Sequence, residues 1–255
     1  MIQEKTKKGK GWLLWATALL LILVPAVLLG RILWQYQQAR KEYKTIAAAY
    51  TKKEPQSAEN AAALSIDWDS LRAENADVIG WIEMPALEVL NYPVVRGKDD
   101  FYYLNHSYTG AYRPAGAIFM EAQNSGTFAD LHTIVYGHNV KDGSMFGGLT
   151  KFREKDFYEK SGGTFTLYTP NGSWKYEIFS VEDVTVEDPA VYSIGFVKGA
   201  EYEAFLTAMK QRSLYDTGVA VDGNDYVITL STCVSGTSQT AERFAVHAKC
   251  AEKLS

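Results

Sequence analysis

The sequence predicts a mainly β domain, folded as a closed or nearly closed barrel, that follows one apolar N-terminal helix. Three observations predict it. Short apolar runs bounded by turn residues recur through most of the chain. Only a few helical patterns interrupt these runs, which is typical of a barrel with short insertions. A single long apolar segment stands apart near the N-terminus, and the chain's 255 residues suffice for one sizeable core in addition to that segment.

The apolar segment has the length and flanks of a membrane anchor. Four lysines lie within residues 1–10, and the run Trp12–Gly30 contains Thr17 as its only polar residue. As a helix this run rises about 28 Å, close to the hydrocarbon thickness of a bilayer. A cleaved signal peptide is the competing interpretation, but the run is long for one and no small-x-small cleavage site follows it.

This N-terminal pattern predicts three segments before the folded domain. Residues 1–11 form a basic tail that stays in the cytoplasm by the positive-inside rule, and residues 12–34 form the transmembrane anchor. Residues 35–65, rich in Lys, Glu, Gln and Ala, are expected to form a solvated, partly helical stalk outside the cell. The folded domain is expected over residues 66–255, with Asp67 capping its first helix.

The folded domain is expected to alternate short strands with short helices. The predicted strands are 78–85, 92–95, 116–120, 133–136, 164–168, 174–186, 226–232 and a last strand that ends at Cys250. The predicted helices are 67–76, 99–104, 147–152, 155–160 and a longer one at 199–212, whose apolar residues recur at helical spacing.

Charge and cysteine content exclude several classes of function. Residues 1–53 hold ten basic against two acidic residues, and residues 54–255 hold sixteen basic against twenty-eight acidic ones. The acidic domain argues against a nucleic-acid partner. Two cysteines, Cys233 and Cys250, are too few for a disulfide framework or a structural zinc site. We expect Cys250 to be a buried, inert thiol and disfavour a disulfide between the two; neither a metal nor a cofactor is expected.

The candidate reactive site lies at the ends of predicted strands. Cys233 ends one strand and Arg243 begins the next, so strand pairing brings a thiol and a guanidinium close together. His138 follows the end of the strand H-T-I-V-Y and enters the loop G-H-N-V-K-D-G-S-M-F, whose Gly137 and Gly143 free the backbone. Thiol chemistry at an amide carbonyl needs a thiolate, a proton donor and a positive charge for the oxyanion. Structural or surface roles are expected for the other histidines, His106, His132 and His247.

These residues also carry a resemblance to a known family. T-L-S-T-C (229–233), followed ten residues later by Arg243 and preceded by Y-G-H-N (136–139), resembles the sortase family of bacterial surface transpeptidases. The fuller Y-G-H-N-V-K-D-G-S-M-F segment (136–146), D-V-I-G-W-I (77–82) and N-Y-P-V-V (91–95) resemble class B sortases. The match covers roughly residues 67–249.

The resemblance implies a fold and a reaction. The fold would be an eight-stranded sortase β-barrel with N-terminal helices and a long helix before the last two strands. Cys233 would attack the threonine carbonyl of a C-terminal sorting signal on a secreted protein and form a thioacyl-enzyme. An amine of a peptidoglycan precursor or cross-bridge would then resolve it. His138 would act as acid and base, and Arg243 would hold the carbonyl or stabilise the oxyanion.

The resemblance further implies a substrate groove and a location. Ser231 and Tyr136 would line the groove, with Tyr192 and Asn105 as weaker candidates. The enzyme would be a single-pass protein of a Gram-positive type envelope, with its N-terminus in the cytoplasm and its catalytic domain outside.

Three other functions remain open from the sequence. A membrane-anchored cysteine peptidase would release peptides to water instead of transferring them to an amine. A non-catalytic wall-binding module would make Cys233 incidental. A pilus-polymerising sortase is disfavoured, because no second apolar span follows the predicted barrel and no N-terminal lid motif is evident.

Overall fold

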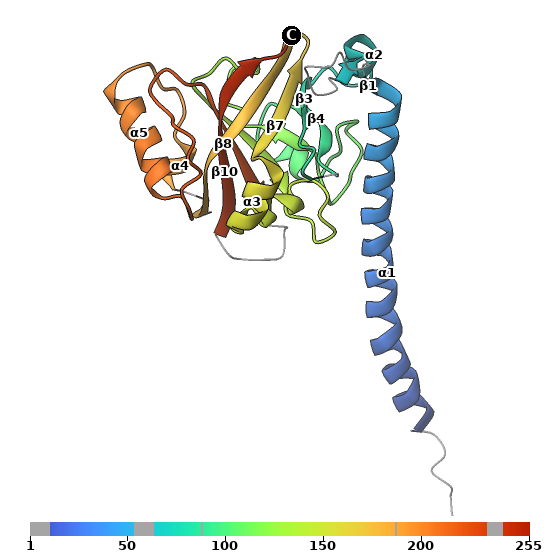
Figure 1. The fold of residues 1–255 in the computed structure, drawn as a ribbon. Coiled ribbons are helices and arrows are strands. Elements are labelled where there is room, and N and C mark those ends of the chain that lie inside the picture. Colours follow the sequence, from blue (N-terminus) through green and yellow to red (C-terminus); the bar gives the residue numbers. More distant parts are fainter. Residues whose placement is uncertain (1–10, 54–63, 88, 187, 234–241) are drawn as a thin grey trace, which may run out of the picture.

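The computed structural model describes residues 11–53, 64–87, 89–186, 188–233 and 242–255 (Figure 1). Its helices are α1 (Gly11–Tyr50), α2 (Trp68–Glu74), η1 (Tyr102–Leu104), η2 (Gly147–Arg153), α3 (Lys155–Ser161), α4 (Pro189–Tyr192) and α5 (Ala200–Gln211). Its strands are β1 (Thr51–Lys53), β2 (Leu64–Ile66), β3 (Val78–Glu83), β4 (Asn91–Val95), β5 (Ile118–Met120), β6 (His132–His138), β7 (Thr164–Thr169), β8 (Gly172–Thr185), β9 (Val227–Cys233) and β10 (Glu242–Lys253).

Eight of the described strands close into a barrel in the order β10-β8-β7-β3-β4-β5-β6-β9, which confirms the predicted fold class. Most neighbours are antiparallel, but β6 and β9 are parallel, as are β4 and β5. A parallel pair brings the same ends of two strands together, so the C-terminal ends of β6 and β9 meet at one rim of the barrel. We call this end, where β10 also begins, the reactive rim.

The barrel core is filled by alternating strand residues. On β10, Phe244, Val246 and Ala248 join the main core, whereas Ala245 faces outward and packs against Val191 of α4. Both faces of this strand are therefore covered, which explains why every residue from Phe244 to Ala248 is buried. Helix α5, predicted from its apolar spacing, uses Tyr202, Leu206 and Met209 to pack on the outside of the barrel in a second cluster.

Local sequence signals account for several boundaries. Asp67 caps α2 through its carboxylate, which accepts a hydrogen bond from Ser70 N at 3.1 Å, as predicted. Gly162, with φ +73°, ends α3 in the left-handed conformation that favours glycine. The segment predicted as a helix at 99–104 contains only the 3₁₀ turn η1, because Asp99 accepts from Phe101 N and Tyr102 N and forms a turn there.

The segment predicted as a solvated stalk is organised differently. Helix α1 runs without interruption through the apolar segment and on to Tyr50, and its last four turns pack on the barrel. Tyr43 and Ile46 are only 4% and 5% exposed, and Tyr43 Oη donates to Gly116 O at 2.8 Å. Strand β1 then pairs with β2, so the chain returns to the barrel at Leu64. One face of this part of α1 carries an apolar stripe whose members are one or two helical turns apart, namely Tyr36, Tyr43, Ala47 and Tyr50. This periodicity is typical of a helix that packs on another surface.

Candidate active site

Backbone pairing places the predicted nucleophile and the predicted base side by side. Strands β6 and β9 run in parallel over seven paired residues, and the last pair joins His138 to Cys233. Paired residues of neighbouring strands lie about 5 Å apart. The side chain of Cys233 lies outside the described part of the structure, so its position follows from its place on the backbone. Residues 95 apart in sequence thus meet at the reactive rim.

Arg243 reaches the same rim from the other side of β9. Ala245 of β10 is paired with Ser231 of β9, so the antiparallel register brings Arg243 level with Cys233 two residues further on. Thr232 Oγ1 supports this register by accepting from Phe244 N at 2.9 Å. The Arg243 guanidinium is close enough to His138 to contribute to lowering the pKa of its imidazole.

His138 is held in one tautomer. Its Nε2–H donates to the carbonyl of Leu104 in η1 at 2.5 Å. Because that nitrogen carries the proton of the neutral ring, Nδ1 offers a lone pair, and no described residue bonds to it. The ring is 7% exposed, and burial lowers its pKa first, with the positive charge of Arg243 adding to the effect. A neutral imidazole with a free Nδ1 beside a cysteine is a competent proton acceptor.

The loop after His138 folds back over this residue. The His138 carbonyl accepts from both Val140 N and Phe146 N, at 3.1 and 3.0 Å. Gly143 has φ +80°, a left-handed backbone conformation that favours glycine, which agrees with the conformational freedom predicted for it. Gly137 is glycine for a different reason than we predicted: a Cβ there would lie 2.7 Å from the Phe146 ring. Close approach of the loop to the strand, and not a special backbone angle, selects this residue.

The four residues predicted to bind substrate fall into two groups. Tyr192 of α4 and Ser231 of β9 share a hydrogen bond of 2.8 Å between their hydroxyls, and the rings of Tyr136 and Tyr192 stack with centroids 6.4 Å apart. These three side chains form one cluster two residues before the reactive pair. Asn105 is exposed and belongs to the other side of His138, directly after the Leu104 carbonyl that binds the imidazole.

The tyrosine cluster rests on a carboxylate that sequence reasoning missed. Glu121, 8% exposed, accepts from Tyr136 Oη at 2.9 Å. Burial, together with a hydrogen bond to Glu121, raises the pKa of the neighbouring Asp100 to about 6. Asp100 therefore keeps its proton to a higher pH than an ordinary aspartate does. No sequence motif marks this pair, since Asp100 and Glu121 come from different loops.

The second cysteine lies at the opposite end of the barrel. Cys250 N donates to Tyr226 O at 2.8 Å, just before β9 begins, and Cys233 ends that strand seven residues later. Seven strand residues span about 23 Å, whereas a disulfide needs Cα atoms within about 7 Å, so the two cysteines cannot pair within this fold.

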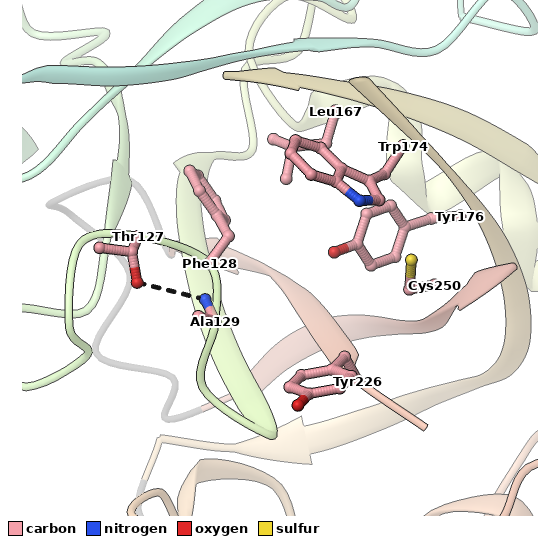
Figure 2. A pocket seen from close by; sticks show the side chains of 8 residues that line it. All are labelled: Thr127, Phe128, Ala129, Leu167, Trp174, Tyr176, Tyr226 and Cys250. Atoms are coloured by element: carbon pink, nitrogen blue, oxygen red, sulfur yellow. Dashed lines mark hydrogen bonds between the residues drawn. The ribbon is translucent and has the colours of Figure 1, made fainter. Parts of the chain in front are cut away.

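Cys250 is partly buried, not fully buried as predicted. It lines a pocket of about 250 Å³ together with Leu167, Trp174, Tyr176 and Tyr226 (Figure 2). Burial raises the pKa of its thiol, which disfavours the reactive thiolate, in keeping with the inert role that we predicted.

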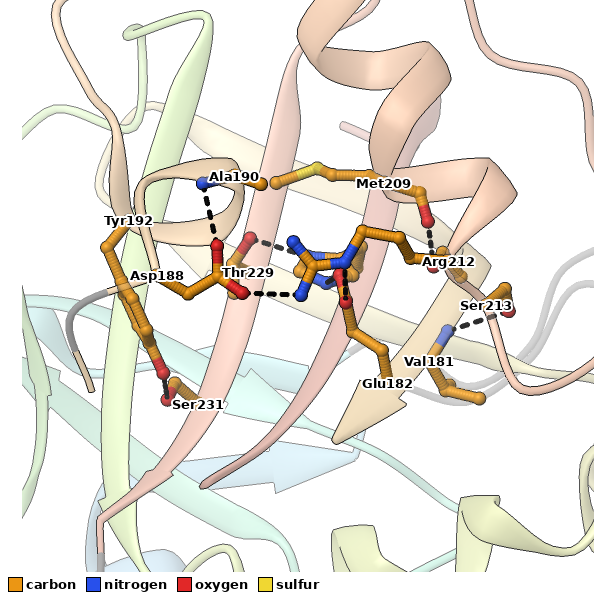
Figure 3. Close-up of polar contacts among 12 residues, drawn as sticks. Val181, Glu182, Asp188, Ala190, Tyr192, Met209, Arg212, Ser213, Thr229 and Ser231 are labelled. Carbon is orange, nitrogen blue, oxygen red and sulfur yellow. Dashed lines mark hydrogen bonds and ion pairs between the residues drawn. The ribbon is translucent and has the colours of Figure 1, made fainter. Parts of the chain in front are cut away.

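Behind the tyrosine cluster runs a buried chain of polar contacts (Figure 3). Thr229 Oγ1 lies 2.7 Å from His132 Nε2 and 2.8 Å from His247 Nδ1. The chain continues from His247 Nε2 to Glu182 Oε1 at 3.0 Å and from Glu182 Oε2 to Arg212 Nε at 2.8 Å. All but the arginine are at most 2% exposed. We call these five residues the buried polar chain.

The buried polar chain is tied to α4 at both of its ends. Arg212 forms an ion pair with Asp188 Oδ2 at 2.5 Å, and Asp188 caps α4 by accepting from Ala190 N. His132 Nδ1 bonds the carbonyl of Ser193 at 2.7 Å, directly after Tyr192. The short helix that carries Tyr192 is thus fixed before and after that residue. His132 and His247 therefore have the structural role that was predicted for them.

The contacts also fix the protons of this chain. The Ser193 carbonyl can only accept, so His132 Nδ1 donates and its Nε2 accepts from the Thr229 hydroxyl. Because the Thr229 hydroxyl proton is donated to His132 Nε2, Thr229 Oγ1 accepts a hydrogen bond from His247 Nδ1–H. A proton must then lie between His247 Nε2 and Glu182 Oε1, because two lone pairs would otherwise face each other. In this arrangement both nitrogens of each histidine and the Thr229 hydroxyl have a hydrogen-bond partner, whereas Glu182 Oε2 contacts Arg212 only as an ion pair.

His132 predicts a pH dependence of stability. Burial lowers its folded-state pKa to about 4, below its ordinary value of 6.5. Between these values the unfolded chain binds more protons, so stability is complete above about pH 6.5 and is lost as pH falls towards 4. The loss attributable to His132 should reach about 3 kcal/mol at pH 4. Urea unfolding of wild type and His132→Gln from pH 7.5 to 4 measures it: the two curves should converge on acidification, and parallel curves would contradict the assignment.

Comparison with known proteins agrees with this architecture. A family model for the sortase domain matches residues 82–251. Sortase B of Listeria monocytogenes is 37% identical over 183 residues, covering 72% of this chain and 73% of that protein. Sortase B of Staphylococcus aureus is 34% identical, covering 71% of this chain and 73% of that protein.

Solved structures agree as well. The crystal structure of sortase B from Bacillus anthracis superposes with a TM-score of 0.74 at 32% identity, over 86% of this chain and 99% of that one. The Staphylococcus aureus sortase B–substrate complex gives 0.73 at 30% identity, over 87% and 100%. The chain therefore belongs to the sortase family, and within it to the class B sortases, which are cysteine transpeptidases of cell-wall anchoring.

Proposed function

We propose that this enzyme cleaves the C-terminal sorting signal of secreted proteins after a threonine and transfers the threonine carbonyl to a cell-wall amine. The observation that carries the proposal is the pairing of His138 with Cys233, with Arg243 level on the next strand. A free imidazole nitrogen beside the cysteine supplies the proton acceptor that the thiol needs.

The proposed reaction balances without a cofactor. His138 Nδ1 takes the thiol proton of Cys233, and the sulfur forms a bond to the threonine carbonyl carbon. The C–N bond breaks, and the departing amine takes the proton from Nδ1. The incoming amine then attacks the thioester and gives a proton to Nδ1, which returns it to the thiolate. Arg243 stabilises the oxyanion in both steps through its fixed charge and forked donors.

The neighbouring residues receive proposed roles in this scheme. Tyr192, Ser231 and Tyr136 line the groove that holds the signal, and exposed Asn105 borders it beyond His138. The apolar part of α1 anchors the enzyme in the membrane. This helix is the one described segment that is long and apolar enough to cross a bilayer, and none of that stretch is covered by protein. The basic tail is proposed to be cytoplasmic and the barrel extracellular.

A transfer assay tests the proposal. The full chain in detergent micelles is incubated with peptides that carry a central threonine at a fixed position, with and without triglycine, and the products are identified by mass spectrometry. We expect an adduct that joins the threonine carbonyl to triglycine, and slow hydrolysis at the same bond without it. Matched peptides with alanine in place of threonine should react poorly. Hydrolysis alone at saturating triglycine would indicate a peptidase, and uncleaved peptide would indicate a binding module.

A further inference from the structure

We propose that the docked helix α1 turns the reactive rim towards the membrane and seats it at the headgroup layer, so that the catalytic rim forms a lipid-facing surface. The inference rests on the proposed membrane anchor and adds the direction in which the enzyme works. It starts from the continuity of α1 between the apolar run and the docked turns.

The docked part of α1 is fixed to the barrel at several points. Tyr43 Oη bonds Gly116 O, and the Tyr43 ring meets Tyr92 edge-on with centroids 4.9 Å apart. Glu42 forms an ion pair with Arg113 at 2.9 Å. A helix held by buried aromatic contacts and an ion pair cannot swing freely, so the direction of α1 relative to the barrel is set by packing.

The order of contacts along α1 shows which end of the barrel lies towards the anchor. Tyr50, at the far end of the helix, bonds Glu74 of α2. About three turns nearer the anchor, Arg40 acts electrostatically on Tyr92, as does Asp142 of the loop that follows His138. Moving along α1 towards the apolar run therefore means moving towards the reactive rim.

Figure 1 shows the same relation directly. The N-terminal half of α1 extends past the end of the barrel at which β10 begins, and the C-terminus of the chain lies at the opposite end. Since β10 begins at the reactive rim, the apolar half of the helix and the rim point the same way. The pocket that contains Cys250 lies at the end of the barrel that is farther from the membrane in this orientation.

The spacing leaves little room between barrel and bilayer. The large apolar side chains of α1 from Trp12 to Trp34 are 46–79% exposed, so water is an unfavourable surrounding for them. Arg31 ends the uncharged run, and Tyr36 already packs on the barrel. From Gly30 to Tyr36 the helix rises about 9 Å, comparable to the headgroup layer.

This orientation suits a transpeptidase whose substrates are held by lipid. A rim at the headgroups would meet a sorting signal that leads into a membrane span, and an amine of a peptidoglycan precursor that is held in the membrane. Tethering both substrates in the layer that the rim faces raises their effective concentration at Cys233. A rim that faced away would need each substrate to extend along the whole barrel, about 40 Å by the length of β10.

Site-specific quenching in vesicles tests the orientation without using activity. A fluorophore is attached through Lys141→Cys at the rim loop or through Glu252→Cys at the far end, each in the full chain with Cys233→Ala and Cys250→Ala, reconstituted with nitroxide-headgroup lipids. Both positions are exposed. Because the ends of β10 lie about 40 Å apart, we expect about twofold or greater quenching at position 141 and little at 252. Equal quenching, or stronger quenching at 252, would overturn the proposal.

An insertion separates orientation from catalysis. Seven helix-forming residues placed between Trp34 and Gln35 lift the barrel by about 10 Å and turn it by only about 20°. In otherwise native full chain, cleavage of a soluble threonine peptide should be unchanged, while cleavage of a vesicle-anchored peptide with a short spacer should fall about tenfold. Undiminished cleavage of the anchored peptide would contradict the proposal. A chain that fails to float with vesicles would overturn the anchor and the orientation together, while soluble transfer would stand.

Discussion

Replacing Cys233 with alanine is expected to abolish cleavage and transfer, with kcat/KM falling by more than about 10³-fold. The physical reason is that the thioacyl bond cannot form without the sulfur, and what remains is substrate binding beside His138 and Arg243. Initial rates on the threonine peptide measure the loss, and mass spectrometry of the quenched enzyme detects the acyl adduct.

Cys250 provides the matched control for this substitution. It is the same residue type in the next strand, but it lies at the opposite end of the barrel with a thiol whose pKa is raised by burial. Cys250→Ala should therefore retain wild-type kcat/KM and the acyl adduct. Should the adduct survive in Cys233→Ala, or disappear in Cys250→Ala, the assignment of the nucleophile would be wrong.

Breaking the buried polar chain at Glu182 is expected to lower the free energy of unfolding by about 3–5 kcal/mol. Glu182 is 2% exposed and balances both His247 and Arg212. Its removal leaves the buried imidazole of His247 without its carboxylate partner and leaves Arg212 paired with Asp188 alone. Urea denaturation of Glu182→Ala against wild type measures the change, and the KM for peptide should rise because the anchor of α4, and with it Tyr192, is loosened.

The neighbouring carboxylate on the same strand is the control. Asp183 forms an ion pair with Arg153, but both side chains are about half exposed. An exposed pair contributes at most about 1 kcal/mol, so Asp183→Ala should cost little stability and leave KM unchanged. Similar losses for Glu182→Ala and Asp183→Ala would show that the buried chain has no special part in holding α4.

Periodicity and turn chemistry predicted most elements of the fold correctly. The strands that became β3, β4, β7, β8 and β9 were placed within about two residues, because each alternates and ends at a turn former. The stalk was misjudged. Its stripe Tyr36, Tyr43, Ala47, Tyr50 is diluted by charged residues on the other faces of the helix, and only the barrel surface shows that the stripe has a partner.

The candidate site likewise contains residues that the sequence predicts and residues that it does not. Cys233, His138 and Arg243 stand out in the sequence because each lies at a strand end beside a loop, and the family motifs surround them. The residues that hold the side chains of the site in place do not stand out in the sequence. The Leu104 carbonyl that fixes the tautomer of His138, and the Glu121–Asp100 pair beneath Tyr136, are ordinary residues of loops far away in the chain.

By itself the sequence determined which chemistry is available and which stretches become strands, because side-chain types and a period of two are local properties. The tertiary structure alone decided which strand ends meet, which proton each buried histidine carries and which way the reactive rim faces. Those features depend on the closure of the barrel and on the docking of α1, where groups distant in sequence must satisfy one another's hydrogen bonds and packing at the same time.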